Sequence, residues 1–155
     1  MSGTGAPKLE VDGNGLRVGI VAASWHTQVM DGLLAGARRA LAAADVSDVE
    51  VLRVPGAFEL PLGAARLLER CDAVVALGVV IRGGTPHFEY VCSAAADGLL
   101  RASLDAKRPV GFGLLTCDDE QQAIDRAGLP GSHEDKGAEA AQAALAMAVS
   151  LPFAR

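Results

Sequence analysis

One turn of the sequence gathers groups that could bind an anion and move a proton beside it. The apolar stretch 73–81, rich in β-branched residues, ends in the run 82–86 (Arg-Gly-Gly-Thr-Pro), and His87 follows at once. Backbone N–H groups, a guanidinium, a hydroxyl and an imidazole therefore meet at the carboxyl end of an expected strand. Such a turn suits a phosphate with an acid–base group next to it.

Two interpretations of this turn are open. Thr85 is a natural N-cap and Pro86 a natural first helical residue, so the turn could simply be a well-capped helix start. The run matches neither GxGxxG nor the Walker pattern, which gives little support to a nucleotide site. His87 favours catalysis, because the dipole of the following helix disfavours an imidazolium in the first turn and leaves a neutral ring that can pass protons.

Other residues with chemical potential follow two other expected strands or flank a loop. Trp25 and Phe58 could pack in the core or stack on a flat heterocycle. Glu59 could complement a helix dipole or accept hydrogen bonds from sugar or polyol hydroxyls. Arg126 and Lys136 flank a loop, where solvated charges are usual. They could reach a phosphate only if the fold or a neighbouring subunit brings them to it.

Strands and helices alternate along the chain. Hydrophobic periodicity predicts strands at 16–23, 48–54, 73–81 and 109–115, and helices at 27–44, 57–70, 86–104, 118–127 and 136–150. The pattern predicts an α/β fold: right-handed βαβ crossovers and a four-stranded, mainly parallel sheet with helices on both faces, a three-layer sandwich. Ligands of such sheets bind outside the carboxyl ends of the strands.

Bulk properties narrow the functional class. The 155 residues predict one domain, 16–155, after a flexible arm at 1–15 with a short strand at 9–11. A hydrophobic content of 50% predicts extra burial between subunits. The net charge of −5, without a basic cluster, argues against nucleic acid as a partner.

Targeting features point to a cytoplasmic protein. No apolar run approaches the ~20 residues of a membrane span, and the first residues lack the pattern of a signal peptide. The three cysteines are odd in number and widely spaced, and we expect them to be reduced thiols. The three histidines lack ligand-like spacing, so we expect no metal site.

Five segments together closely resemble the 6,7-dimethyl-8-ribityllumazine synthase family. They are 24–26 (Ser-Trp-His), 54–61 (Val-Pro-Gly-Ala-Phe-Glu-Leu-Pro), 76–91, 125–128 (Asp-Arg-Ala-Gly) and 135–137 (Asp-Lys-Gly). The most specific is the Gly-x-Val-Ile-Arg-Gly-x-Thr-x-His block in its strand–turn–helix context. The likeness extends from about residue 16 to residue 151.

The resemblance implies a flavodoxin-like fold and a condensation that needs no cofactor. Its small-molecule substrates would be 5-amino-6-(D-ribitylamino)uracil and 3,4-dihydroxy-2-butanone 4-phosphate, in the penultimate step of riboflavin biosynthesis. The amine would attack the ketone to give an imine, phosphate would be eliminated, and ring closure with loss of water would yield the lumazine.

The resemblance also implies the roles of individual residues. Trp25 would stack on the pyrimidine, and His87 would transfer protons. Further contacts would come from the ribityl pocket (Ala57, Phe58, Glu59), the backbone along the pyrimidine edge (Val79, Val80, Ile81) and the phosphate site (Gly84, Thr85). A neighbouring subunit would supply Phe112 over the ring, Arg126 to the phosphate, and Lys136.

Two features of the chain depart from the family's commonest pattern. Gly84 stands where many members carry a side chain, so a phosphate contact there would rest on the backbone alone. The link from Arg126 to Lys136 is longer than in members that form 60-subunit shells, which predicts a homopentamer. The alternatives are a non-catalytic flavin- or ribityl-binding module of flavodoxin-like fold and a structural shell protein, and the longer link disfavours the latter.

Overall fold

The four predicted strands form one fully parallel sheet in the order β2-β1-β3-β4. We describe residues 5–152 of a computed structural model. The strands are β1 (Arg17–Ala23), β2 (Asp48–Val54), β3 (Ala73–Ile81) and β4 (Val110–Cys117). The central strands β1 and β3 are almost continuously apolar, which is typical of strands covered on both faces.

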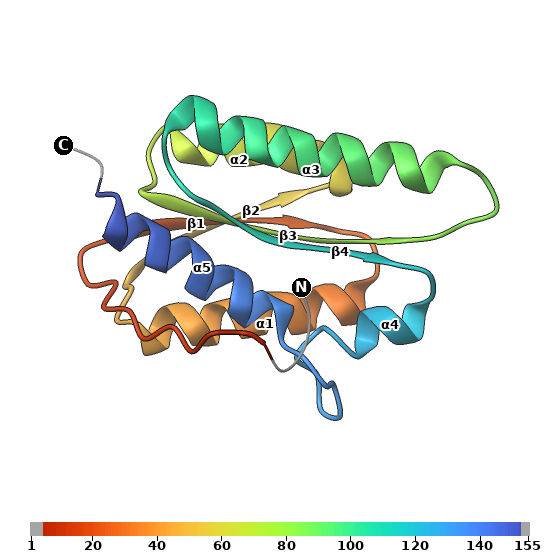
Figure 1. Cartoon of the computed structure of the whole chain (residues 1–155), viewed down its shortest axis with the longest axis horizontal. Coiled ribbons are helices and arrows are strands. Elements are labelled where there is room, and N and C mark those ends of the chain that lie inside the picture. Colours follow the sequence, from red (N-terminus) through yellow and green to blue (C-terminus); the bar gives the residue numbers. More distant parts are fainter. Residues whose placement is uncertain (1–4, 153–155) are drawn as a thin grey trace.

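Helices cover both faces of this sheet (Figure 1). One face carries α2 (Leu60–Leu68) and α3 (His87–Ala106). The other carries α1 (Thr27–Ala43), α4 (Glu120–Ile124) and α5 (Lys136–Ser150). The three-layer α/β sandwich predicted from the sequence is therefore confirmed, and its strand order is that of flavodoxin-like sheets.

Alternate residues of the central strands feed two separate hydrophobic cores. In β3, Val75 and Leu77 belong to the core beneath α1 and α5, whereas Val74 and Ala76 belong to the core beneath α2 and α3. This alternation follows from the period of two in a strand. Both cores fix the end of β3, which carries the turn at 82–86.

Several predicted boundaries shift for local reasons. Residues 57–59 form a short 3-10 helix, η1, before α2, because Pro61 lacks an N–H and is tolerated only in the first turn of α2. β4 continues to Cys117, which pairs with Ile81. The helix predicted at 118–127 is confined to α4, where the Asp119 side chain accepts a hydrogen bond from the N–H of Gln122.

Two local predictions are wrong. No strand forms at 9–11: this stretch lies along the helical layer of α1 and α5, away from the sheet edges (Figure 1), and Val11 packs against that core. Thr85 is not the N-cap of α3. Pro86 holds that position with helical φ and ψ of −63° and −2°, and no side-chain hydrogen bond caps the helix.

The described residues do not cover the chain completely. The first four residues of the predicted arm (1–15) and the last three of the predicted domain (16–155) lie outside them. Within residues 5–152, none of the helices has the length and apolarity required to cross a bilayer.

Candidate active site

A pocket of about 670 Å³ opens at the carboxyl ends of β1, β2 and β3. This is the point at which the strand order reverses, where open α/β sheets bind their ligands. Its volume lies in the range that small-molecule sites occupy, about 300–1,000 Å³. The lining residues are Trp25, His26, Gly56, Ala57, Phe58, Glu59, Val79, Val80, Ile81, His87, Tyr90 and Val91.

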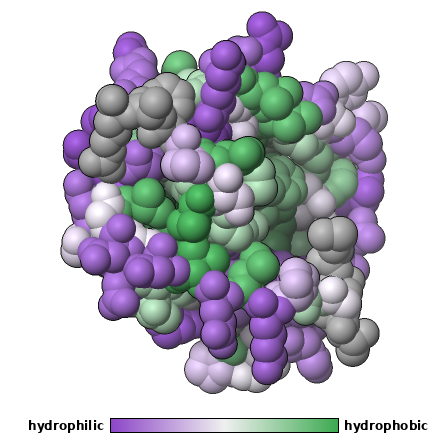
Figure 2. Space-filling model, turned by 60° about the vertical axis from the view of Figure 1, so that its left-hand side comes forward, coloured by the Kyte–Doolittle hydropathy of each residue, from purple (hydrophilic) through white to green (hydrophobic). Residues whose placement is uncertain are grey.

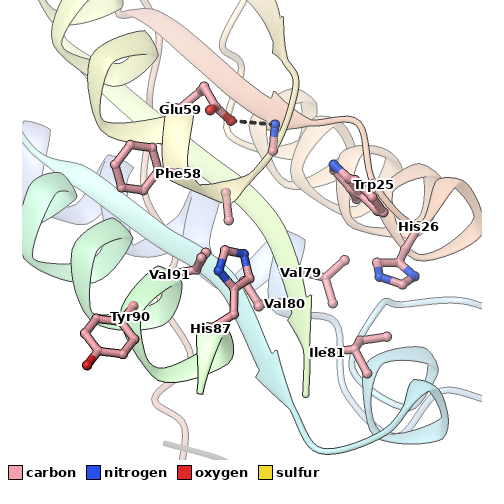
Figure 3. Close-up of a pocket in the computed structure, with 12 residues that line it drawn as sticks. Trp25, His26, Phe58, Glu59, Val79, Val80, Ile81, His87, Tyr90 and Val91 are labelled. Atoms are coloured by element: carbon pink, nitrogen blue, oxygen red, sulfur yellow. Dashed lines mark hydrogen bonds between the residues drawn. The ribbon is translucent and has the colours of Figure 1, made fainter. Parts of the chain in front are cut away.

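Trp25 and His26 form one side of the pocket (Figure 3). The Trp25 side chain follows β1 and is 68% exposed, so its alternative role in core packing is wrong. His26 adopts a left-handed backbone conformation, with φ 60° and ψ 69°. The two rings lie at a centroid distance of 6.5 Å and are tilted by 47°, so they form a corner and are not stacked on one another.

The opposite side carries an aromatic ring and a carboxylate. Phe58 is 64% exposed, which removes the core-packing interpretation for this residue as well. Glu59 ends η1, and its Oε2 accepts a hydrogen bond from the backbone N–H of Gly56 at 2.9 Å (Figure 3). This bond fixes the carboxylate at the turn after β2 while Oε1 remains able to accept a hydrogen bond from a ligand.

His87 lies between these two sides. It is the first residue of α3, and its imidazole lies near the end of β3, where Val79, Val80 and Ile81 line the pocket (Figure 3). The last strand residues become partly exposed at this edge, so a ligand can reach the backbone there. A flat ring between Trp25 and His87 would therefore meet a strand edge along one side.

The turn before His87 is exposed. Gly83, Gly84 and Thr85 all lie at the surface, and a Cβ added at either glycine would meet nothing within 4 Å. Because α3 has no side-chain cap, the Thr85 hydroxyl is not used for capping. Gly84 and Thr85 are not among the residues that line the pocket and instead adjoin it through the chain.

Three predicted site residues lie away from the pocket of their own chain. Phe112 is 52% exposed on β4. Arg126 lies after α4, where its Nη1 donates to the carbonyl oxygen of Gln122 at 2.9 Å. Lys136 begins α5. None of the three belongs to the described pocket lining.

Lys136 stands in a carboxylate environment. Its Nζ lies 2.6 Å from Glu134 and 2.7 Å from Glu139, and its side chain is 15% exposed. Burial alone would lower the pKa of Lys136, but the hydrogen bonds to Glu134 and Glu139 outweigh burial and raise that pKa. Lys136 is therefore a charged group held at the base of the 128–135 loop.

That loop is well ordered by its own hydrogen bonds. Gly128 takes a left-handed φ of 66°, and its N–H donates to Glu134 O at 3.0 Å. The N–H of Lys136 donates to Arg126 O at 3.0 Å. Arg126 and Lys136 thus stand at the two closed ends of one loop, which projects beyond α4 and α5 in Figure 1.

Four lining residues were not predicted from the sequence: His26, Gly56, Tyr90 and Val91. His26 follows Trp25 at a strand end, a position that could have marked it. Tyr90 lies one helical turn after His87, a spacing that places both on one side of α3. Within residues 5–152, no group of three or more His, Cys, Asp or Glu side chains is arranged to hold a metal ion.

Comparison with known proteins gives consistent matches over nearly the whole chain. The family model described as 6,7-dimethyl-8-ribityllumazine synthase matches residues 15–151. A protein of that name from Kineococcus radiotolerans is 64% identical over 152 residues, covering 97% of this chain and 94% of its own. One from Kocuria rhizophila is 63% identical over 99% of this chain and 100% of its own. One from Cutibacterium acnes is 60% identical over 98% of this chain and 92% of its own.

Proposed function

Since the chain belongs to the 6,7-dimethyl-8-ribityllumazine synthase family, we propose that it condenses 5-amino-6-(D-ribitylamino)uracil with 3,4-dihydroxy-2-butanone 4-phosphate in riboflavin biosynthesis. One observation carries the proposal: a single pocket at the switch point joins an exposed indole, a carboxylate, an exposed strand edge and the imidazole of His87. We assign the reaction to one domain, 16–155, working in the cytoplasm.

The pyrimidine lies against Trp25. The residue is 68% exposed, and its indole offers a large flat surface to a heterocycle. The backbone of Val79, Val80 and Ile81 at the end of β3 then hydrogen-bonds the polar edge of the ring. These interactions orient the 5-amino group toward His87.

The ribityl chain extends toward η1. Ala57 and Phe58 supply the apolar wall, and Oε1 of Glu59 accepts hydrogen bonds from the ribityl hydroxyls. Because Gly56 already holds Oε2, the carboxylate is oriented before the substrate arrives. This pre-organisation reduces the entropy lost on binding.

The phosphate of the second substrate lies at the turn before α3. The N–H of Gly84, the Thr85 hydroxyl and the positive end of this 20-residue helix all favour an anion there. The carbonyl of that substrate is thereby placed beside the 5-amino group, next to His87. Holding two reactants in this way supplies much of the rate enhancement.

His87 then moves protons between successive intermediates. The neutral imidazole takes a proton from the attacking amine and returns one to the departing hydroxyl, so one water leaves as the imine forms. Loss of a proton from the adjacent carbon gives an enamine whose electrons expel phosphate from the terminal carbon and leave an enol. The enol takes a proton on that terminal carbon and loses its hydroxyl proton, which gives a methyl ketone. The ribitylamine nitrogen attacks this ketone, and a second water leaves as the ring closes. The atoms and electrons of the substrates and products balance without an oxidant, a reductant or a cofactor.

A neighbouring copy completes the site in this proposal. Phe112, Arg126 and Lys136 lie outside the pocket of their own chain, and each has an exposed or loop-end position from which it can serve another subunit. Exposed apolar side chains on α3, β4 and α5 support such contact: Leu100, Leu104, Phe112, Met147 and Val149. Figure 2 shows hydrophobic side chains gathered on one face with hydrophilic ones around them.

We assign the assembly to a homopentamer. The ordered loop at 128–135 projects from the chain, where it would interfere with packing between pentamers. Light scattering should give a mass near five times the chain mass of 15.9 kDa. A mass near that of a 60-subunit shell would overturn this assignment.

Mixed assemblies test whether the site is shared. Arg126→Ala should weaken binding of the phosphate substrate, and His87→Ala should slow turnover. Refolding the two variants together should restore about a quarter of the sites, since a random mixture pairs an intact His87 with an intact neighbouring Arg126 at that frequency. If the mixture, assayed at subsaturating phosphate substrate, is no more active than the average of its parents, both residues serve one chain.

Formation of the fluorescent lumazine tests the activity itself. The two substrates react spontaneously, so the measured quantity is the rate above that background at several protein concentrations. Acceleration proportional to protein supports the enzyme. Tight binding of the product without acceleration would favour the alternative of a non-catalytic ribityl-binding module.

A further inference from the structure

Arg82, the cation of the turn at 82–86, forms ion pairs with carboxylates of the same chain. Its Nε donates to Asp118 Oδ1 at 2.8 Å, and its Nη1 donates to Glu89 Oε1. The guanidinium carbon also lies 4.2 Å from the centroid of the Phe88 ring. Two negative charges and an aromatic face therefore satisfy a group that the sequence suggested for an anionic ligand.

The ionisation of the partners agrees with this geometry. The hydrogen bond from Arg82 is the main cause that lowers the pKa of Glu89. The hydrogen bonds to Asp118 and Glu89 raise the pKa of Arg82. Both shifts favour the charged forms of Arg82 and Glu89, so the ion pair between them persists at neutral pH.

Arg82 joins three elements that meet at the site. It directly follows β3, Glu89 lies in the first turn of α3 two residues after His87, and Asp118 directly follows β4. The N–H of Arg82 donates to Cys117 O at 2.9 Å, which adds a backbone tie to β4. The exposed turn between these anchors has little packing of its own, as the open space around Gly83 and Gly84 shows.

We propose that Arg82 is a positioning residue that holds the 83–86 turn and His87 in place through Glu89 and Asp118, and is not a ligand of the phosphate. The proposal rests on the function proposed above. Exposed ion pairs contribute little to stability, and these side chains are about half exposed. Small displacements of reacting groups, by contrast, can cost up to ~100-fold in rate.

Kinetics of Arg82→Met, Glu89→Gln and the double variant test the proposal. Arg66→Met is the matched control, because Arg66 and Glu69 form an exposed pair and neither residue lines the pocket. We expect kcat/KM for the phosphate substrate to fall about tenfold in either single variant, and the double variant to be no worse than Arg82→Met. The control should keep wild-type kinetics, and Tm should change by similar small amounts throughout.

Two outcomes would overturn the proposal. If Glu89→Gln preserves or strengthens competitive inhibition by inorganic phosphate while Arg82→Met abolishes it, Arg82 is a direct ligand. If Arg82→Met is kinetically identical to Arg66→Met, the network positions nothing. Arg82→Lys should recover only part of the rate, because an ammonium group cannot reproduce the fork of a guanidinium.

Hydrogen exchange tests the positioning role of Arg82 independently of the proposed enzyme activity. In the unliganded protein, amides of the first turn of α3 (87–91) should exchange faster in Arg82→Met than in wild type or Arg66→Met. This measurement does not depend on activity. Faster exchange in a protein that fails to accelerate the condensation would support the positioning role and reject the enzyme, whereas unchanged exchange would reject the positioning role.

Discussion

The carboxylate of Glu59 accepts a hydrogen bond from the N–H of Gly56 at 2.9 Å, across the turn that follows β2. This contact uses one carboxylate oxygen and directs the side chain to the pocket that Trp25 lines from the other side. Glu59 therefore has both a local structural partner and an oxygen left for a substrate. A change that removes only its charge can separate these two tasks.

Glu59→Gln should weaken binding of the ribitylamino substrate with little change in kcat. Its amide oxygen can still accept the bond from Gly56, but charge-assisted bonds to ribityl hydroxyls, each worth about 1.5–3 kcal/mol, are lost. We expect KM for this substrate to rise about tenfold or more. Glu69→Gln, on the exposed end of α2, is the control and should leave KM unchanged. Equal KM values in all three proteins would contradict the assigned role.

His87→Ala should lower kcat by about 10²-fold or somewhat less, because general acid–base catalysis contributes 10²–10⁴-fold and the uncatalysed reaction is facile. Affinity for the pyrimidine should stay near that of wild type, since Trp25 and Glu59 are intact. His133→Ala is a suitable control, because His133 lies exposed on the 128–135 loop. A wild-type kcat in His87→Ala would exclude proton transfer by this residue.

Much of the fold follows from the sequence because the residues that begin and end each strand are local signals. The strand predicted at 73–81 is exact, since a continuous apolar run between polar ends has one plausible length. The strand at 48–54 is also exact, because Pro55 and Gly56 close it. The strand expected at 9–11 fails for a non-local reason: this stretch lies against the helical layer and has no strand to pair with.

The candidate site was predictable where strand ends determine it. Trp25, Glu59 and His87 each follow or adjoin a strand end, and parallel strands bring these ends together. The pair of ionic contacts that Arg82 makes was not predictable. Glu89 is close to Arg82 in sequence, but Asp118 lies 36 residues away, and it approaches Arg82 only because β3 pairs with β4. His26 follows Trp25 at the same strand end and could have been predicted on that ground, whereas its left-handed backbone is set by the folded turn.

Gly137→Ala should destabilise the protein, although alanine is the better helix former by about 1 kcal/mol. A Cβ at Gly137 would lie 2.0 Å from the carbonyl oxygen of Leu33, so α1 and α5 would have to separate. Overpacking of this kind typically costs about 1–3 kcal/mol. Thermal unfolding should show a Tm several degrees below that of wild type.

A control from the same helix fixes the sign of this effect. Ala143 is exposed on α5 in the single chain, so Ala143→Gly tests helix propensity without overpacking against α1 and should cost about 1 kcal/mol. Gly137→Ala reverses the usual order of the two residues only if the close approach of the helices is real. A rise in Tm for Gly137→Ala would show that α1 and α5 have room to spare.

Glu50 gives the fold a specific sensitivity to acid. The carboxylate of Glu50 on β2 accepts a hydrogen bond from Nε of Arg70 at 2.9 Å and lies 3.4 Å from Nη2 of Arg17. The hydrogen bond from Arg70 is the main cause that lowers the pKa of Glu50 below its ordinary value of 4.5. A lowered pKa in the folded state means that the ionised carboxylate stabilises the fold above that ordinary value. This contribution is lost as the pH falls through the lowered pKa.

Glu50→Gln should therefore have a lower Tm than wild type at neutral pH, by a small amount because all three side chains are partly exposed. The gap between the two Tm values should persist while the pH stays above 4.5, the ordinary pKa of the carboxyl, and close as the pH falls through the lowered pKa of Glu50. Scanning calorimetry from pH 7 to pH 3 measures this gap directly. Glu69→Gln, which breaks one exposed pair with Arg66, controls for general loss of surface charge. A gap that stays constant across this range would mean that the Arg70 contact does not stabilise ionised Glu50.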